Sequence, residues 1–228
     1  MNLVVFDIDD TLTRTMDVDT QCFVQTGSDL LRMELDDVSW DDFPDVTDTA
    51  VLNVIYERRR GRLPTDTEVG RFIDYFLTLL REHHEVDASR FRQVEGAQTL
   101  LAALGTRNDW TVALATGAWK RTAEFKLNVA GIFDELLPLA TSDDHHTRAG
   151  IFNTAVQRAK RASGTSGYHR IVAVGDGPWD VRTAQELGVP FIGVGSDARL
   201  REIGAPAGVP DYRDLERFMD LLETAEPP

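Results

Sequence analysis

The chain carries five short, mostly apolar runs. A long interval separates the first run from the second, and helix-length intervals separate the later runs from one another. The first run, Leu3 to Phe6, stops abruptly at Asp7, as a strand buried on both faces does. The other runs are Trp110 to Ala115, Glu135 to Ala140, Arg170 to Val174 and Pro190 to Val194. Strands that alternate with helices favour a parallel sheet covered by helices on both faces. We therefore predict an α/β fold with a Rossmann-like core.

About eighty residues after the first strand show helical stripes and no convincing strand. The clearest stripe begins with a capping box, Thr65 and Glu68, and another ends at Gly61. This segment predicts an all-helical cap inserted into the core. We expect the core to comprise residues 1–14 and 92–228, and the cap residues 15–91.

Charge and cysteine content restrict the protein's environment and partners. The 24 Lys and Arg residues against 38 Asp and Glu residues give a net charge of −14, which repels nucleic-acid backbones and anionic lipids. Cys22 is the single cysteine, so no intramolecular disulfide forms. The N-terminus has no basic leader, and no apolar run is long enough to span a bilayer. We expect a cytoplasmic protein that binds neither nucleic acid nor membranes.

Four acids follow two of the expected strands. Asp7 and Asp9 come after the first strand, and Asp176 and Asp180 come after the fourth. An acid after a buried strand often only caps the next turn, but open parallel sheets bind ligands at the carboxyl ends of their strands. Thr116 and Gly117 add a hydroxyl and exposed backbone amides after the second strand. Three such strand ends together predict a ligand site.

These motifs resemble those of the haloacid dehalogenase superfamily of aspartate-nucleophile phosphohydrolases. Asp7-x-Asp9-x-Thr11 is similar to the first motif, Thr116 to the second, and Gly175-Asp176-x-x-x-Asp180 to the fourth. The resemblance covers the whole chain and includes a helical cap after the first strand. It implies a Rossmann-like core, Mg²⁺ dependence and a covalent aspartyl-phosphate intermediate.

The resemblance also implies a role for each motif residue. Asp7 is the expected nucleophile and Asp9 the expected general acid and base. Mg²⁺ is expected on the Asp7 carboxylate, the Asp9 main-chain carbonyl and Asp176. Supporting or phosphate-binding roles fall to Thr11, Asp180, Thr116 and Gly117. The acid at position 9 points to ester leaving groups rather than to dehalogenation.

The third motif departs from the family, whose members usually carry a lysine before the fourth motif. The polar stretch 142–148 offers Arg148 instead, which keeps the charge and adds a two-pronged donor. Lys120, four residues after Thr116, is the competing cation. A further alternative is that Arg148 only tethers a carboxylate such as Asp180.

We expect a Mg²⁺-dependent phosphatase of small phosphorylated metabolites, similar to phosphoglycolate phosphatases. Thr47 and Asp48 begin a cap helix and either only cap it or contact substrate. One alternative function is a phosphomutase of the β-phosphoglucomutase type. Another is a non-catalytic module that binds phosphate or a partner. The chain is expected to be a monomer or a homodimer.

Overall fold

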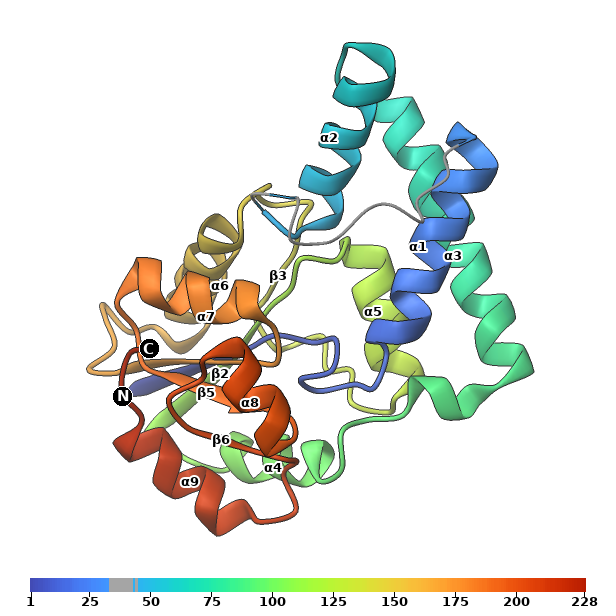
Figure 1. The fold of residues 1–228 in the computed structure, drawn as a ribbon. Helices are drawn as coiled ribbons and strands as arrows, with labels where there is room; N and C mark the ends of the chain where they lie inside the picture. The colour runs from blue at the N-terminus through green and yellow to red at the C-terminus, as the bar shows by residue number, and fades with distance from the viewer. Residues whose placement is uncertain (33–42, 44) are drawn as a thin grey trace.

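The sheet determines where every motif residue lies. The structure is a computed structural model that describes residues 1–32, 43 and 45–228. Six strands form one parallel sheet in the order β3-β2-β1-β4-β5-β6, with β1 in the interior (Figure 1). The strands are β1 (Asn2–Phe6), β2 (Trp110–Ala115), β3 (Leu139–Ala140), β4 (Ile171–Gly175), β5 (Phe191–Val194) and β6 (Gly208–Val209). The predicted α/β fold class is confirmed.

Helices of the core cover both faces of this sheet. On one face Val4 and Phe6 pack against α4, α5 and α9, and on the other Leu3 and Val5 pack against α6, α7 and α8. The core helices are α4 (Ala97–Gly105), α5 (Lys120–Val129), α6 (Arg148–Ser163), α7 (Pro178–Leu187), α8 (Asp197–Ile203) and α9 (Leu215–Thr224). Burial on both faces explains why β1 consists only of apolar residues after Asn2.

The insertion between β1 and β2 is helical in its described residues. It contains α1 (Met16–Leu31), α2 (Asp48–Arg60), α3 (Asp66–Val86) and the short 3₁₀ helix η2 (Ala88–Phe91). The capping box at Thr65 forms, and Gly61 ends α2 with a φ of 64°. These helices lie together on one side of the molecule (Figure 1) and enclose their own cluster of apolar side chains. The cap limits at residues 15 and 91 stay a prediction.

Trp119 joins the cap to the core. Its indole ring is buried in the apolar cluster of the cap, stacked at 6.1 Å on Phe23 and edge-on at 5.7 Å to Phe72. The indole Nε1 donates to the Thr49 hydroxyl oxygen at 2.9 Å. Because the main chain of Trp119 directly follows the Thr116 loop, this packing holds the helical cap over the ends of the strands.

One expected strand is wrong in length. Residues 135–137 make no ladder with β2, the Pro138 carbonyl oxygen accepts one hydrogen bond from the Leu114 amide at 2.7 Å, and β3 contains only Leu139–Ala140. The Asp134 carboxylate accepts a hydrogen bond from the Leu136 amide at 2.9 Å and bends the chain into a turn. Leu136 is consequently 82% exposed rather than packed in the sheet. This apolar run therefore begins with a local turn and joins the sheet only at its end.

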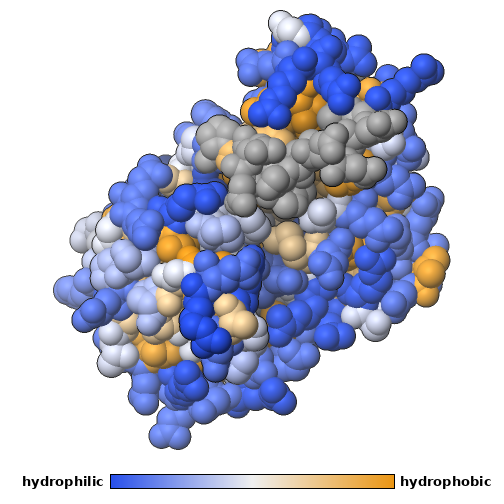
Figure 2. All heavy atoms as spheres, in the orientation of Figure 1, coloured by the Kyte–Doolittle hydropathy of each residue, from blue (hydrophilic) through white to orange (hydrophobic). Residues whose placement is uncertain are grey.

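The visible face of the molecule is mostly hydrophilic, in keeping with the charge content (Figure 2). Among the described helices, none combines the length and apolar character needed to cross a membrane.

Candidate active site

Three carboxylates converge at the ends of β1 and β4. Asp7 follows β1, Asp176 follows β4, and Asp180 lies in the first turn of α7. One carboxylate oxygen from each lies within 4.8 Å of the others. Burial raises the pKa of Asp7 and of Asp176 well above the usual range, and the charge of Asp180 raises both further. Proximity of three buried like charges is costly unless a cation joins them.

The chemistry of this group fits a hard divalent cation. The Asp176 Oδ1 atom is buried and finds no hydrogen-bond partner among the described residues. An orphaned carboxylate oxygen of this kind is satisfied when it becomes a metal ligand, and oxygen ligands are those that Mg²⁺ prefers. The three carboxylates therefore make a candidate Mg²⁺ site.

Arg148 reaches this group from the first turn of α6. Its Nη1 atom lies 3.1 Å from Asp7 Oδ1 and 3.4 Å from Asp180 Oδ1. Its Nε atom donates to the Val46 carbonyl oxygen at 2.7 Å, and the guanidinium lies 5.7 Å from the Trp179 ring centroid. The side chain thus contacts both the expected nucleophile, Asp7, and Asp180. The sequence had left open whether Arg148 contacts the nucleophile or only tethers a carboxylate such as Asp180, and the geometry shows both contacts.

Lys120 does not lie in this site. Its ammonium pairs with Glu124 at 3.4 Å, and its side chain is 63% exposed. It lines no part of the cavity at Asp7 that the described residues enclose. The expectation that Lys120 supplies the missing charge is at odds with this placement, because the first turn of α5 directs the side chain along its own helix.

The sequence reasoning missed Lys126, which lies on the same helix and is fully buried. Its ammonium donates to Asp9 Oδ2 at 2.6 Å and to Asp19 Oδ1 at 2.5 Å. It shares the inward face of α5 with Ala123 and Leu127. A lysine on an apolar helical stripe was the signal that could have identified it, because a buried ammonium requires carboxylate partners.

The Asp9 side chain is held firmly on the cap side of the site. Besides Lys126, it accepts a hydrogen bond from the Thr15 hydroxyl at 2.6 Å on Oδ1. Asp10 follows with a φ of 53°, a left-handed conformation that aspartate tolerates and that turns the chain after the motif. Thr11, expected in support, is fully buried, and its Oγ1 has no hydrogen-bond partner among the described residues.

The loop after β2 lies against the N-terminus of α2. Thr116 is buried, and Gly117 comes so close to Arg148 that a built Cβ would lie 2.7 Å from Nη2. The Gly117 carbonyl oxygen accepts from the Asp48 amide at 2.8 Å. The Thr47 hydroxyl oxygen caps α2 by accepting from the Ala50 amide at 3.1 Å, which is one of the two roles that the sequence left open for it.

Asp48 faces the cavity from the first turn of α2. Its Oδ2 accepts from the Trp119 amide at 2.9 Å. Burial raises its pKa well above the usual range, and the charge of Asp19 raises it further. A substrate-facing position, which the sequence left as one of two alternatives, is therefore available to it.

A cavity of about 50 Å³ lies between these core and cap residues. Its wall contains Asp7, Asp9, Asp19, Asp48, Thr116, Gly117, Arg148 and Trp179, together with Met16, Thr20, Val46, Thr47, Val51 and Ala118.

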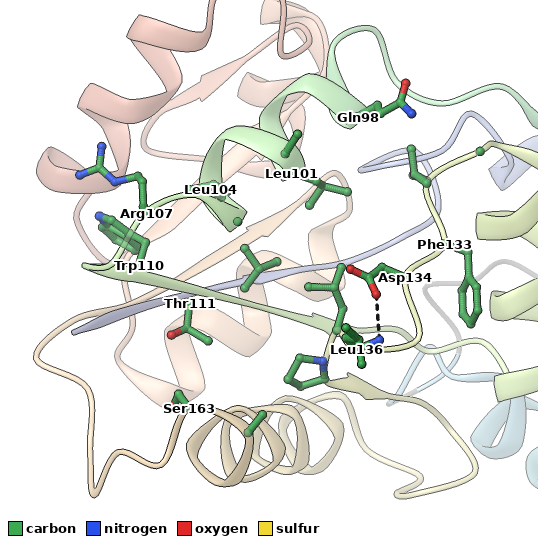
Figure 3. Close-up of a pocket in the computed structure, with 18 residues that line it drawn as sticks. Gln98, Leu101, Leu104, Arg107, Trp110, Thr111, Phe133, Asp134, Leu136 and Ser163 are labelled. Carbon is green, nitrogen blue, oxygen red and sulfur yellow. Dashed lines mark hydrogen bonds between the residues drawn. The ribbon is translucent and has the colours of Figure 1, made fainter.

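A wider hollow of about 530 Å³ lies elsewhere, beside β2 and α4 (Figure 3). Leu101, Leu104 and Trp110 contribute apolar side chains to it. None of the motif residues reaches it, so its size does not make it the reaction site.

The first 188 residues match the family model of the haloacid dehalogenase-like hydrolases. The chain belongs to this family. Membership of the haloacid dehalogenase-like hydrolases confirms the predicted resemblance and the expectation of a phosphatase-type hydrolase. Members of this family generally use Mg²⁺, and the acidic cluster of Asp7, Asp176 and Asp180 is present. No curated protein matches the chain significantly.

Solved structures with the same fold cover nearly the whole haloacid dehalogenase-like chain. A hydrolase from Pseudomonas syringae shares 20% identity at a TM-score of 0.72, with 99% of this chain and 100% of that chain covered. A β-phosphoglucomutase from Clostridium difficile shares 16% identity at a TM-score of 0.68, with 97% and 96% covered. A haloacid dehalogenase hydrolase of family IA, variant 3, from Entamoeba histolytica shares 17% identity at a TM-score of 0.66, with 98% of this chain and 100% of that chain covered.

Proposed function

We propose that this haloacid dehalogenase-like chain is a Mg²⁺-dependent phosphatase of small phosphorylated metabolites. The observation that carries the proposal is the position of Asp7. Its carboxylate lies at the carboxyl end of an interior strand, 3.1 Å from the Arg148 guanidinium and within 4.8 Å of the Asp176 and Asp180 carboxylates. A nucleophile, a cation for the phosphoryl oxygens and a metal site are thereby brought to one point.

In the first step the Asp7 carboxylate oxygen attacks phosphorus, and the bond from phosphorus to the alcohol oxygen breaks. Asp9 gives its proton to the departing alcohol oxygen. In the second step Asp9 takes a proton from water, whose oxygen attacks the same phosphorus and releases inorganic phosphate. Asp7 returns as a free carboxylate, so atoms and protons balance.

Arg148 is placed to hold the phosphoryl oxygens against Asp7. Its guanidinium is fixed by the Val46 carbonyl and Asp180, so little freedom remains to be lost when phosphate arrives. The Thr116 hydroxyl and the backbone at Gly117 supply further donors from the neighbouring strand end. Such preorganised donors contribute about 3 kcal/mol each to transition-state stabilisation.

The proposed Mg²⁺ ligands are the Asp7 carboxylate, the Asp9 main-chain carbonyl and Asp176, with Asp180 completing the carboxylate group. When bound, Mg²⁺ neutralises part of the charge on the phosphoryl group. Asp180 also orients the Arg148 guanidinium, which contacts the Asp7 carboxylate. Cytoplasmic location and a monomeric or homodimeric state are part of the same proposal.

The test is hydrolysis of p-nitrophenyl phosphate with Mg²⁺ and with excess EDTA. Wild-type protein should release nitrophenol only with Mg²⁺, and Asp7→Asn should lose several orders of magnitude in turnover because the amide is not a nucleophile. The exposed Asp109→Asn is the matched control and should keep wild-type turnover. Full activity of Asp7→Asn, or of wild-type protein in EDTA, would refute the mechanism.

A further inference from the structure

The cavity wall on the cap side of the phosphate-binding residues is acidic. Asp9 follows β1, Asp19 lies on α1, and Asp48 begins α2. Among the described residues that line the cavity, Arg148 is the only lysine or arginine, and it is committed to Asp7 and Asp180. The part of a substrate that lies beyond the phosphoryl group therefore meets carboxylates.

Lys126 does not change this conclusion. Its side chain has no exposed area, and it is absent from the cavity wall among the described residues, because it lies behind the Asp9 and Asp19 carboxylates. An anionic group entering the cavity would meet three carboxylates before it met this ammonium. Because the Lys126 ammonium is already bonded to Asp9 and Asp19, the described residues on this side of the cavity offer carboxyl oxygens and no free ammonium to an entering group.

These carboxylates do not form a second metal site. Among the described residues, only Asp7, Asp176 and Asp180 bring three ligand atoms close enough together to hold a metal ion. The charge of Asp19 raises the cost of ionising Asp48: burial raises the pKa of Asp19 to about 6, and burial together with the charge of Asp19 raises the pKa of Asp48 well above the usual range. A monovalent cationic group between them would relieve this repulsion.

A second, independent feature indicates a bound phosphate ester. Trp179 lines the same cavity and is only 8% exposed, yet its indole Nε1 has no hydrogen-bond acceptor among the described residues. Its ring lies against the Arg148 guanidinium on the core side. A phosphoryl oxygen supplies an acceptor there, while Asp19 and Asp48 lie on the cap helices at the leaving-group side.

The cavity also limits the size of the alcohol. The cavity volume of about 50 Å³ holds roughly three to five water molecules, or about 90–150 Å³ of liquid volume. That space fits a phosphoryl group with a two- or three-carbon alcohol.

We propose that the substrate is a phosphate monoester of a small amino alcohol, whose ammonium group binds between Asp19 and Asp48. This inference rests on the proposed phosphatase function. Hydrolysis then releases the amino alcohol and inorganic phosphate. The same acidic wall rejects alcohols that carry a carboxylate or a second phosphate.

Three two-carbon substrates test the proposal: phosphoethanolamine, 2-hydroxyethyl phosphate and phosphoglycolate. They differ chiefly in the cationic, neutral or anionic group opposite the phosphate. We expect kcat/KM for phosphoethanolamine to exceed that for 2-hydroxyethyl phosphate about tenfold or more, the size expected for one charge-assisted hydrogen bond, with phosphoglycolate slowest. Equal rates, or a preference for phosphoglycolate, would overturn the proposal.

A variant pair tests the residues. Asp48→Asn should lower the ratio of kcat/KM for phosphoethanolamine to that for 2-hydroxyethyl phosphate about tenfold, and the ratio cancels any inactive fraction of the preparation. Asp17→Asn removes an exposed acid from α1 outside the cavity and should leave the ratio unchanged. An unchanged ratio in Asp48→Asn would refute the assignment.

Hydrolysis of p-nitrophenyl phosphate by the same preparations separates two failures. If this ester is hydrolysed with Mg²⁺ while the charge series shows no preference for the amine, only the substrate class is wrong. If no ester is hydrolysed, the phosphatase function and the inference that rests on it both fail.

Discussion

Replacing Lys126 by Met removes one buried charge and keeps most of the side-chain volume. The ammonium bridges two carboxylates at 2.6 and 2.5 Å, and the side chains of Asp9 and Asp19 are only 9% and 14% exposed. Breaking a buried ion pair by removing one partner costs about 3–5 kcal/mol, because the remaining charge stays buried without compensation. We expect a loss of this size in the free energy of unfolding at pH 8.

The loss should depend on pH in a defined direction. Burial raises the pKa of Asp19 from 3.8 to about 6, although the charge of Lys126 lowers it. The difference corresponds to about 3 kcal/mol in favour of the protonated carboxyl in the fold. An acid whose pKa is raised by folding stabilises the fold at pH values below its pKa in the unfolded chain. This stabilisation is lost as the pH rises through its pKa in the folded protein. In Lys126→Met the pKa of Asp19 rises further, so the penalty is greatest above pH 6 and decreases as Asp19 is protonated.

Urea unfolding of wild-type protein and Lys126→Met at pH 5 and pH 8 measures this effect. We expect a destabilisation of about 3–5 kcal/mol at pH 8 and about 1–2 kcal/mol at pH 5. Lys120→Met, on the same helix but in an exposed pair with Glu124, should cost less than about 0.5 kcal/mol at either pH. Equal losses for Lys126→Met at the two pH values would show that packing rather than charge explains the effect.

Five further substitutions at four positions test the site. Arg148→Lys should keep much of the wild-type turnover and Arg148→Ala should lose most of it, whereas Lys120→Ala should have little effect; a greater loss in Lys120→Ala would reverse the assignment. Asp176→Ala should raise the Mg²⁺ concentration needed for half-maximal activity, since a metal ligand is lost, and an unchanged Mg²⁺ titration would exclude it as a ligand. Gly117→Ala should reduce turnover because its Cβ would lie 2.7 Å from both Arg148 Nη2 and the Val46 carbonyl oxygen. Steady-state kinetics measures this effect, and a kcat equal to that of the wild-type protein would contradict it.

The elements that sequence analysis predicted correctly are those with strong local patterns. β1 is an unbroken apolar run, the helix beginning after Thr65 carries its capping box, and α2 ends at Gly61 where the left-handed conformation suits glycine. Local signals also misled, because the stretch 135–138 belongs to an apolar run but is turned by Asp134. Short-range propensity therefore placed most elements and overstated one strand.

The candidate site was determined in part by the sequence and in part only by the tertiary structure. Asp7 and Asp176 could be placed together from the sequence because adjacent parallel strands end at the same edge of a sheet. The Lys126 contact with Asp9 spans 117 residues, and no local pattern encodes that distance. The packing of cap helices against the core decides which charges meet in the cavity, since electrostatic coupling depends on separation in space rather than along the chain.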